Sequence, residues 1–483
     1  MGMVKDAALF AKDEVRRAVE EMQRVLRRAL PVGSFAEREA AALAITNEVL
    51  GGALREELQA VADEFPDTVL VDGVAYKRHE KGMGRYHSLC GPLEVGRFTY
   101  RQMGVRNGPT IVPLELEAGL VEGATPALAY NVAHGYGQHD MRLHGEMLLM
   151  AHRQPPSRAT LERLAKDIGT AAVLHAPRIE PLVRRGEQVP KGTVAVATGL
   201  DRTAVAMKEQ LPSGAPRKPE PKRKKPRVRR PPKPFDICWR MAYVGTVSFI
   251  DASGEALEVR RYALPACDDP RPLVEQMTAD VRQALRSNPA LQVGIVQDGA
   301  REMWDRTREG MQTLKDEGLL PRWLEGIDRY HLLERLAQAL QVVGIDAAER
   351  HRLLNEWREA FDRKNSTIDD IEQVLLAHYG PLNAAGNVQA CQQLWEHLRY
   401  IGNHKKRMRY VSLRNAGLPV GSGVTESTAK TVVGHRAKRS GQHWGEGGLR
   451  GVLTLRALHQ SHRLPSFWAH LSRRYTAEVV AAA

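Results

Sequence analysis

The chain has 483 residues, of which 43% are hydrophobic and 26% charged, so it is long enough for several globular domains. Its formal net charge of +13 favours a polyanionic partner such as nucleic acid, although charge alone does not determine a fold. Because no apolar run is long enough to span a membrane and no CxxC pair is present, we expect a cytoplasmic protein in a reducing compartment without a cysteine-rich zinc site.

Residues 1–65 predict a helical hairpin. Apolar residues recur at helical spacing over residues 5–30 and again over residues 35–64. Such a hairpin is either a packed helical cap or a dimerisation arm. We favour the packed cap, because most amphipathic helices bury their apolar face within their own chain.

Residues 66–120 predict a small β module. Strand-like residues flank an Asp72-Gly73 turn, and a further strand is expected over residues 93–100. Basic and aromatic side chains interleave in this region. That pattern fits a DNA-contacting surface and, equally well, a small sheet with one solvated face.

Residues 121–185 predict a helical domain that resembles a helix-turn-helix. Two prolines break the chain before Ser157, which is a suitable N-cap for a helix ending at Gly169. Short helices around a tight break are compatible with DNA recognition. Three-helix packing without DNA contact is the alternative.

From residue 190 the pattern alternates between strands and helices. A stretch rich in Pro, Lys and Arg over residues 212–234 interrupts it, and we expect an extended or disordered linker there because it cannot bury a core. The remaining elements are strands at 193–200, 239–250, 256–264, 291–297 and 323–330, and helices at 271–287, from 300 and from 331.

Three carboxylates are placed to meet at one edge of the predicted sheet. Asp201 and Asp298 each follow an apolar strand, and Glu426 follows a Gly-Ser-Gly segment that opens a helix. Ligands bind beyond the carboxyl ends of strands in open α/β sheets. Either aspartate alone is more often a turn or capping residue. Together with Glu426 they favour a Mg²⁺ site for phosphoryl transfer on nucleic acid.

Further candidates surround these carboxylates. Asp328 precedes His331 by three residues after a short strand, and it competes with Asp298 as the second metal ligand. His331 is placed to contact DNA, although a histidine at a helix start is more often structural. The other predicted DNA-binding residues are Lys430, His435, Arg436, Lys438 and Arg439 after the glutamate, and Lys222, Arg223, Lys224 and Lys225 in the linker.

The elements from residue 190 onward follow the order found in ribonuclease H. This order predicts an α/β RNase H-like core with a mixed five-stranded sheet, formed by residues 190–330 and 421–470. An all-α insertion at 331–420 precedes the glutamate. The helical and small β domains that come first are the expected DNA-binding domains.

Four segments carry a resemblance to a known family. Residues 421–444 resemble the glutamate motif of bacterial insertion-sequence transposases of the Kra group, which are relatives of the Mutator group. Residues 199–207 and 296–301 resemble the motifs around the two aspartates of that family. Residues 328–331 resemble its aspartate-x-x-histidine signature, and the whole match covers roughly residues 120–470.

The resemblance implies a DDE transposase in which Asp201, Asp298 and Glu426 hold two Mg²⁺ ions, or Mn²⁺ in their place. It further implies transposon ends and target DNA as partners, at least a dimer on DNA, and a bacterial cytoplasmic location at the nucleoid. Relatives often carry cysteine pairs of a zinc ribbon in the region matching 85–110, where only Cys90 remains here. The alternatives are a non-catalytic DNA-binding protein derived from a transposase, and an RNase H-like nuclease without strand transfer.

Overall fold

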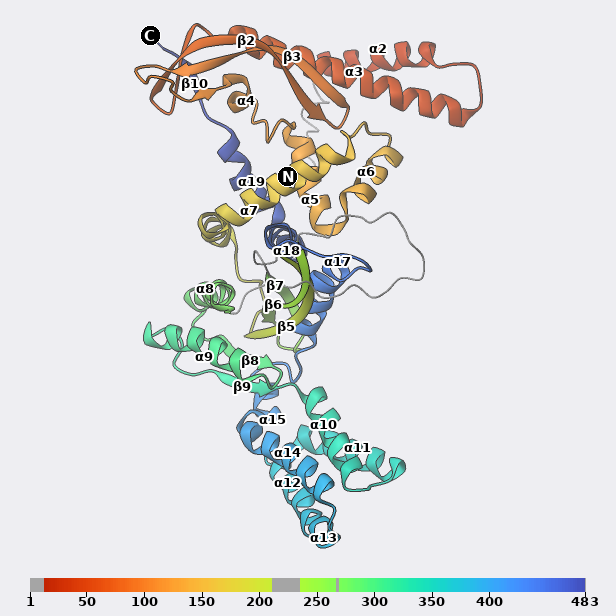
Figure 1. Ribbon diagram of the computed structural model, residues 1–483, viewed down its shortest axis with the longest axis vertical. Coiled ribbons are helices and arrows are strands. Elements are labelled where there is room, and N and C mark those ends of the chain that lie inside the picture. Colours follow the sequence, from red (N-terminus) through yellow and green to blue (C-terminus); the bar gives the residue numbers. More distant parts are fainter. Residues whose placement is uncertain (1–12, 211–234, 266–268, 483) are drawn as a thin grey trace. The chain divides into compact units, whose positions relative to one another are not determined.

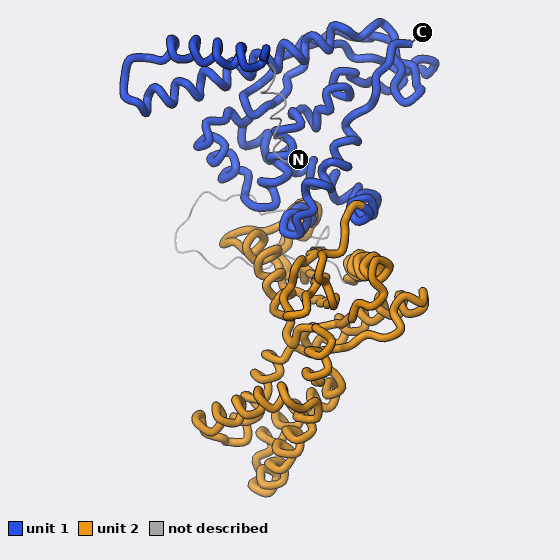
Figure 2. The backbone as a smooth tube through the Cα atoms, turned by 180° about the vertical axis from the view of Figure 1, so that it is seen from behind, with its two compact units in different colours: residues 1–185, 454–483 blue, residues 186–453 orange. Residues whose placement is uncertain are grey.

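The computed structural model describes residues 13–210, 235–265 and 269–482 (Figure 1). The chain divides into two compact units (Figure 2). Unit 1 comprises residues up to Arg185 and from Thr454 onward, and unit 2 comprises Gly186–Leu453. The unit boundary at Arg185 lies close to the one expected at residues 185–190. The second boundary lies at Leu453, inside helix α18 (Glu446–Gln460), whereas the sequence placed the end of the core at residue 470.

Unit 1 begins with a helical hairpin of α2 (Asp13–Ala29) and α3 (Phe35–Glu64). A capping box starts α3, in which Ser34 Oγ accepts from Glu37 N and Glu37 Oε2 accepts from Ser34 N at 2.7 Å. None of the residues of α2 is buried by the part of the chain that the structure describes. The hairpin is confirmed, but α2 is not a packed cap.

The sheet of unit 1 has the strand order β10-β1-β2-β3-β4, and neighbouring strands are antiparallel. The predicted turn is confirmed, because Asp72 and Gly73 both adopt positive φ between β1 and β2. Pairing of the C-terminal β10 with β1 was not predicted. The strands are β1 (Thr68–Val71), β2 (Val74–Ser88), β3 (Gly91–Gln102), β4 (Thr110–Ile111) and β10 (Val479–Ala481).

The remaining helices of unit 1 include one that is longer than the sequence indicates. Helix α7 (Arg158–Gly186) does not end at Gly169 but continues through Pro177 and Pro181. Gly169, Pro177 and Pro181 have weak helix propensity. The burial of an apolar stripe on α7, which includes Ile168 and Ile179, outweighs it. The others are α4 (Pro113–Glu117), α5 (Pro126–Gln138), α6 (Met141–Met150), α19 (Leu464–Ser472) and the short η3 (Arg473–Tyr475).

Unit 2 is built on a five-stranded mixed sheet in the order β7-β6-β5-β8-β9. The first three strands along the chain pair antiparallel, and β8 and β9 then add in parallel. Helices α8 (Arg271–Ser287) and α9 (Arg301–Asp316) make the parallel crossovers. The strands are β5 (Ala195–Gln210), β6 (Phe235–Ile250), β7 (Ala256–Leu264), β8 (Gln292–Gln297) and β9 (Leu324–Ile327).

Both faces of this sheet are covered. Val196 and Leu200 of β5 point into a core with α8 and α9, around Trp304. Ala195 and Ala197 point to the opposite face, into a core shared with the helical insertion. This alternation follows from the two-residue period of a strand, and it makes β5 the buried centre of unit 2.

The segment after β9 is helical, as the sequence predicts. Its buried side chains, Trp357 and Phe361 among them, continue the core on one face of the sheet. The chain then returns to the sheet with α16 (Gly423–Thr428). The inserted helices are α10 (Arg329–Val342), α11 (Ala347–Arg363), α12 (Thr367–Ala377), α13 (Tyr379–Ala384), α14 (Val388–His404), η1 (Lys405–Arg407) and α15 (Tyr410–Asn415).

Candidate active site

Asp201 and Asp298 lie at one edge of the parallel part of the sheet. The pairing between β5 and β8 ends with Thr198 opposite Ile295, and each aspartate lies three residues beyond that pair. The expected strand end at Asp201 is wrong, because β5 continues to Gln210 as a two-stranded ribbon with β6. The parallel ladder nevertheless ends where the sequence placed the carboxylates.

The loop that carries Asp298 is held from both sides. Asp298 Oδ1 accepts a hydrogen bond from Ala300 N at 3.2 Å, which starts the turn into α9. Its backbone oxygen accepts from the indole nitrogen of Trp304 at 2.6 Å, and that side chain is only 1% exposed. A buried aromatic side chain therefore fixes the backbone of this carboxylate.

Glu426 is positioned by the close approach of α16 to the sheet. A Cβ at Gly199 would collide with Thr425 Oγ1 and would lie 2.9 Å from Val296 O, so only glycine lets the helix sit here. Thr425 Oγ1 also hydrogen-bonds Thr246 Oγ1 of β6 at 2.7 Å. Because Glu426 is the next residue, its backbone is held beside β5.

The helix after Glu426 changes its winding. Residues Ala429–Gly434 form η2, a π-helix, and α17 (His435–Ala437) follows. Wider π turns inside helices are frequent at functional sites. Here Lys430 Nζ lies 3.9 Å from Glu426 Oε2, one turn further along.

The three predicted carboxylates line one cleft of about 530 Å³. Asp201 comes from β5, Asp298 from the loop after β8, and Glu426 from α16. Basic side chains and His331 complete the wall. The predicted site residues that line the cleft are Asp201, Asp298, His331, Glu426, Lys430, His435 and Lys438.

Electrostatics show that these carboxylates influence one another. The pKa of Asp201 is raised to about 6, first by burial and then by the negative charges of Asp298 and Glu426. A hydrogen bond from Arg202 N and the nearby His331 act in the opposite direction. Carboxylates that share a partly buried cleft are relieved by a bound cation, and oxygen ligands of this kind suit Mg²⁺ or Mn²⁺.

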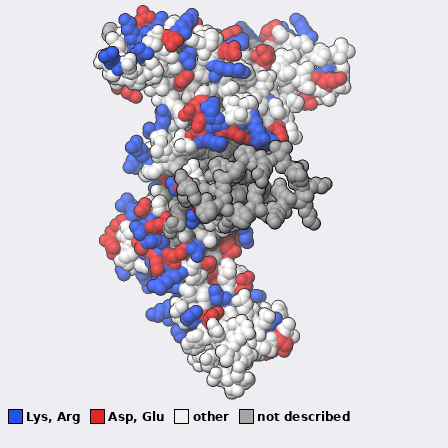
Figure 3. Space-filling view, in the orientation of Figure 1, with Lys and Arg blue, Asp and Glu red and all other residues white. Residues whose placement is uncertain are grey.

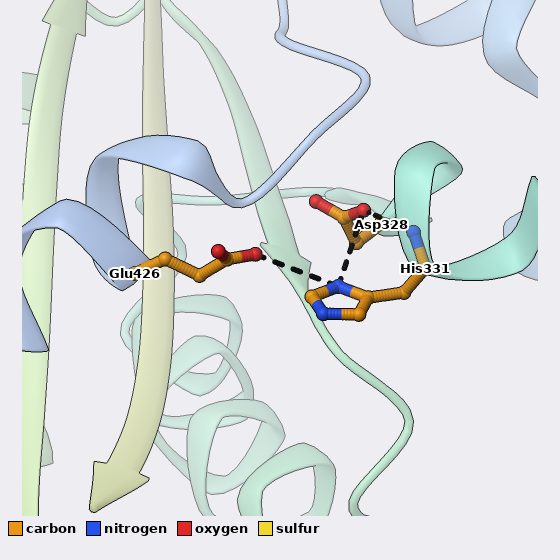
Figure 4. Close-up of side chains that lie close together, drawn as sticks. All are labelled: Asp328, His331 and Glu426. Carbon is orange, nitrogen blue, oxygen red and sulfur yellow. Dashed lines mark hydrogen bonds and ion pairs between the residues drawn. The ribbon is translucent and has the colours of Figure 1, made fainter. Parts of the chain in front are cut away.

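A tighter cluster adjoins the cleft. Ligand atoms of Asp328, His331 and Glu426 all lie within 4.8 Å of one another, so these residues form a group that can hold a metal ion. His331 Nδ1 points between the two carboxylates, 3.3 Å from Asp328 Oδ1 and 3.5 Å from Glu426 Oε1 (Figure 4). Among the described residues, these are the His and acidic side chains close enough together to share one metal ion.

Asp328 has a second role that competes with metal binding. It is the N-cap of α10, and its Oδ1 accepts from His331 N at 2.8 Å. Its Oδ2 accepts from the backbone nitrogen of Ser422 and from Ser422 Oγ at 2.9 Å. The side chain is 1% exposed and absent from the lining of the cleft. We therefore interpret Asp328 as the residue that ties His331 to the start of the glutamate helix.

Two of the predicted DNA-binding arginines, Arg436 and Arg439, differ in their exposure. Arg436 is 3% exposed, and its guanidinium lies 4.8 Å from the ring of Trp444, so it is not presented at the surface; its role in DNA binding stays a prediction. Arg439 is exposed and its Nε donates to His435 O at 3.0 Å. The predicted linker and its contacts Lys222, Arg223, Lys224 and Lys225 lie outside the described residues.

The raised pKa of Asp201 makes a testable prediction for the metal-free protein. A carboxyl with a folded pKa near 6 stabilises the fold only while protonated, so its contribution is lost as pH rises from about 4 to about 6. Asp201→Asn removes this loss. In EDTA we expect the variant to melt a few degrees above the parent at pH 7.5 and together with it at pH 4.5.

Thermal unfolding followed by circular dichroism measures this difference. Added Mg²⁺ should reverse the order at pH 7.5, because only the parent then gains a full set of charged ligands. If the melting temperatures of the two proteins differed by the same amount at pH 7.5 and at pH 4.5, the pKa of Asp201 would not be raised in the folded protein.

No family model matches the chain, and no curated protein is significantly similar to it. No helix among the described residues is both long and apolar enough to cross a membrane.

Proposed function

We propose that the protein is a DNA transposase that cuts and joins DNA strands at the cleft between Asp201, Asp298 and Glu426. The convergence of these three carboxylates from separate elements on one cleft carries the proposal. Basic side chains around them supply the positive charge that a phosphodiester needs. The raised pKa of Asp201 supports a role that includes binding a cation.

The fold of unit 2 supports the same proposal. Three antiparallel strands followed by two parallel ones, in the order β7-β6-β5-β8-β9, are the arrangement expected of an RNase H-like core. The helices between β9 and α16 match the expected all-α insertion before the glutamate. The resemblance of the sequence motifs to Kra-group transposases is what favours transposition over other RNase H-like reactions.

The proposed chemistry is an in-line displacement at phosphorus. In cleavage a water oxygen attacks the phosphorus and the 3′ oxygen leaves as a hydroxyl. In joining, that 3′-hydroxyl attacks a phosphate of the target strand and displaces the 3′ oxygen of the neighbouring target nucleotide. Two Mg²⁺ ions held by the carboxylates would neutralise the attacking and leaving oxygens. Lys430, His435 and Lys438 bind the non-bridging phosphate oxygens and so hold the strand across the cleft.

One observation favours a second candidate. The cluster of Asp328, His331 and Glu426 can hold a single ion, and a one-ion site fits a nuclease that hydrolyses DNA without strand transfer. In that case Asp201 and Asp298 would be dispensable for cleavage. The commitment of both Asp328 oxygens to hydrogen bonds makes this the weaker candidate.

The proposed partners are transposon ends, target DNA and a second copy of the chain, in the bacterial cytoplasm. The exposed apolar side chains of the α2–α3 hairpin support a dimerisation arm: Met22 and Val25 are each 53% exposed and Phe35 is 80% exposed. Sedimentation of the protein with and without DNA checks for this second copy.

A strand-transfer assay tests the proposal. Purified protein is mixed with a supercoiled plasmid and with DNA taken from the two flanks of its own gene, where inverted repeats are expected. With Mg²⁺ we expect end fragments covalently joined to the plasmid, and none in EDTA. Nicked flanks without any joined product would support the nuclease, and bound but uncut DNA would support a non-catalytic DNA-binding protein.

A further inference from the structure

A second cleft of unit 2, about 650 Å³ in volume, lies where the start of β9 meets η1 and α15. We call it the basic cleft. Figure 3 shows Lys and Arg side chains among Asp and Glu side chains on the surface of unit 2. Its charged lining consists of one carboxylate, Glu325, and six cations: Arg308, Lys315, Arg322, Lys406, Arg407 and Arg409.

The carboxylate of the basic cleft, Glu325, accepts hydrogen bonds from residues of the cleft itself. Arg308 grips Glu325 with two hydrogen bonds, of which the Nε bond is 2.7 Å, and Arg407 Nε adds a third at 3.0 Å. Trp323 Nε1 donates a fourth at 3.1 Å. Burial alone would raise the pKa of Glu325, but these bonds lower it, so the group stays ionised. The lining therefore keeps a formal charge of +5.

Four of the cations carry most of this excess. Lys315, Arg322, Lys406 and Arg409 are exposed, and none of them forms an ion pair with a residue that the structure describes. Like charges held around one concave surface repel one another unless an anion lies between them. The basic cleft is thus a preformed site for a polyanion.

We propose that the basic cleft binds the phosphate backbone of DNA outside the carboxylate cleft. This inference rests on the proposed function, which makes DNA the polyanion at hand. Cations projecting from several segments match a chain of phosphates better than a single small anion, since they are spread along a cleft. Contacts of this kind hold DNA in place without reading its sequence.

Two contacts connect the basic cleft to the loop that carries Asp298. The guanidinium of Arg407 stacks 4.3 Å from the ring of Trp304, whose indole nitrogen donates to Asp298 O at 2.6 Å. Arg407, which lines the basic cleft, is therefore linked through Trp304 to the backbone of the second aspartate. The basic cleft would anchor duplex next to the strand being cut.

The test uses one triple variant, the basic-cleft variant, in which three exposed cations are replaced: Arg322→Gln, Lys406→Gln and Arg409→Gln. The control makes the same change in charge elsewhere in unit 2, at the exposed Lys191, Arg286 and Arg399. Binding to a 40-base-pair duplex of arbitrary sequence is measured in EDTA over a range of salt concentrations. Because no chemistry occurs in EDTA, the result does not depend on whether the protein transposes.

We expect the basic-cleft variant to bind on the order of a hundredfold more weakly at about 0.1 M salt, with a salt slope lower by about two to three. The control should lose less than tenfold. Equal losses of DNA affinity in both variants would mean that only the net charge of the protein matters, and they would overturn the inference. Unchanged DNA binding by the basic-cleft variant would also overturn it. If the parent protein carries out strand transfer but the basic-cleft variant binds DNA unchanged, the DNA-binding role of the basic cleft is refuted and the proposed function is not.

Discussion

Glu426→Gln should abolish Mg²⁺-dependent DNA cleavage and joining while leaving DNA binding nearly intact. The glutamine amide keeps an oxygen but loses the charge that offsets a divalent ion between Asp201, Asp298 and residue 426. Loss of one metal ion removes stabilisation of the transition state, and we expect a fall in rate of at least about a thousandfold. DNA affinity comes mainly from Lys and Arg and should change little.

A gel-shift assay and a cleavage assay on the same preparation measure both effects. Asp201→Asn and Asp298→Asn should behave like Glu426→Gln, and a double variant should be no worse than a single one, because the three act as a unit. Glu446→Gln is the matched control, since that side chain is 62% exposed on α18 and lies outside the cleft. Cleavage near the parental rate in Glu426→Gln would refute the DDE assignment.

The second large effect is expected at Asp328. Asp328→Ala removes the buried acceptor of His331 N, Ser422 N and Ser422 Oγ, and leaves these donors without their partner. We expect a loss of about 2–4 kcal/mol in the free energy of unfolding, because bonds to a buried charged group are costly to break. Cleavage should also fall steeply, since the start of the glutamate helix loses its tie to α10.

Asp346→Ala is the matched control for this variant. Asp346 caps α11 by accepting from Ala348 N at 2.9 Å and Glu349 N at 3.0 Å, but on the surface and away from the cleft. We expect it to cost about 1 kcal/mol and to leave cleavage unchanged. Asp328→Asn keeps one acceptor oxygen, so it should retain part of the activity. Complete loss in Asp328→Asn, matching that of Glu426→Gln, would make Asp328 a metal ligand instead.

The elements that place the carboxylates were predictable from the sequence. Apolar strands before Asp201 and Asp298 and a Gly-Ser-Gly segment before Glu426 are local signals, and the sheet edge follows from them by topology. The reach of β5 beyond Asp201 was not predictable, because its partner β6 lies across a segment with no strand signal. The same holds for β10, which pairs with β1 from the other end of the chain.

Side-chain roles were harder to predict than positions. Asp328 has the same local signal as Asp298, a carboxylate after a short strand, yet its hydrogen bonds reach 94 residues along the chain to Ser422. Arg436 is buried against Trp444, and no periodic pattern of apolar residues in the sequence predicts this contact. Gly199 offered an overlooked signal: a glycine inside a β-branched and apolar strand indicates a close approach, here by Thr425.

The basic cleft illustrates the same limit on a larger scale. Its six cations come from α9, the segment before β9, η1 and the residue before α15, which lie up to about 100 residues apart. Each of these segments contains ordinary surface charges. Only the fold brings Arg308, Lys406 and Arg409 around one concavity, so composition predicts the positive charge but not its location.

The location of bound metal tests the central claim most directly. Crystals of the protein soaked in Mn²⁺ can be measured at the manganese absorption edge, where anomalous scattering identifies each ion. We predict two ions about 3.5–4 Å apart, bound by oxygens of Asp201, Asp298 and Glu426. A single ion coordinated by Asp328 and His331, with none beside Asp201, would contradict the account and favour a one-metal nuclease.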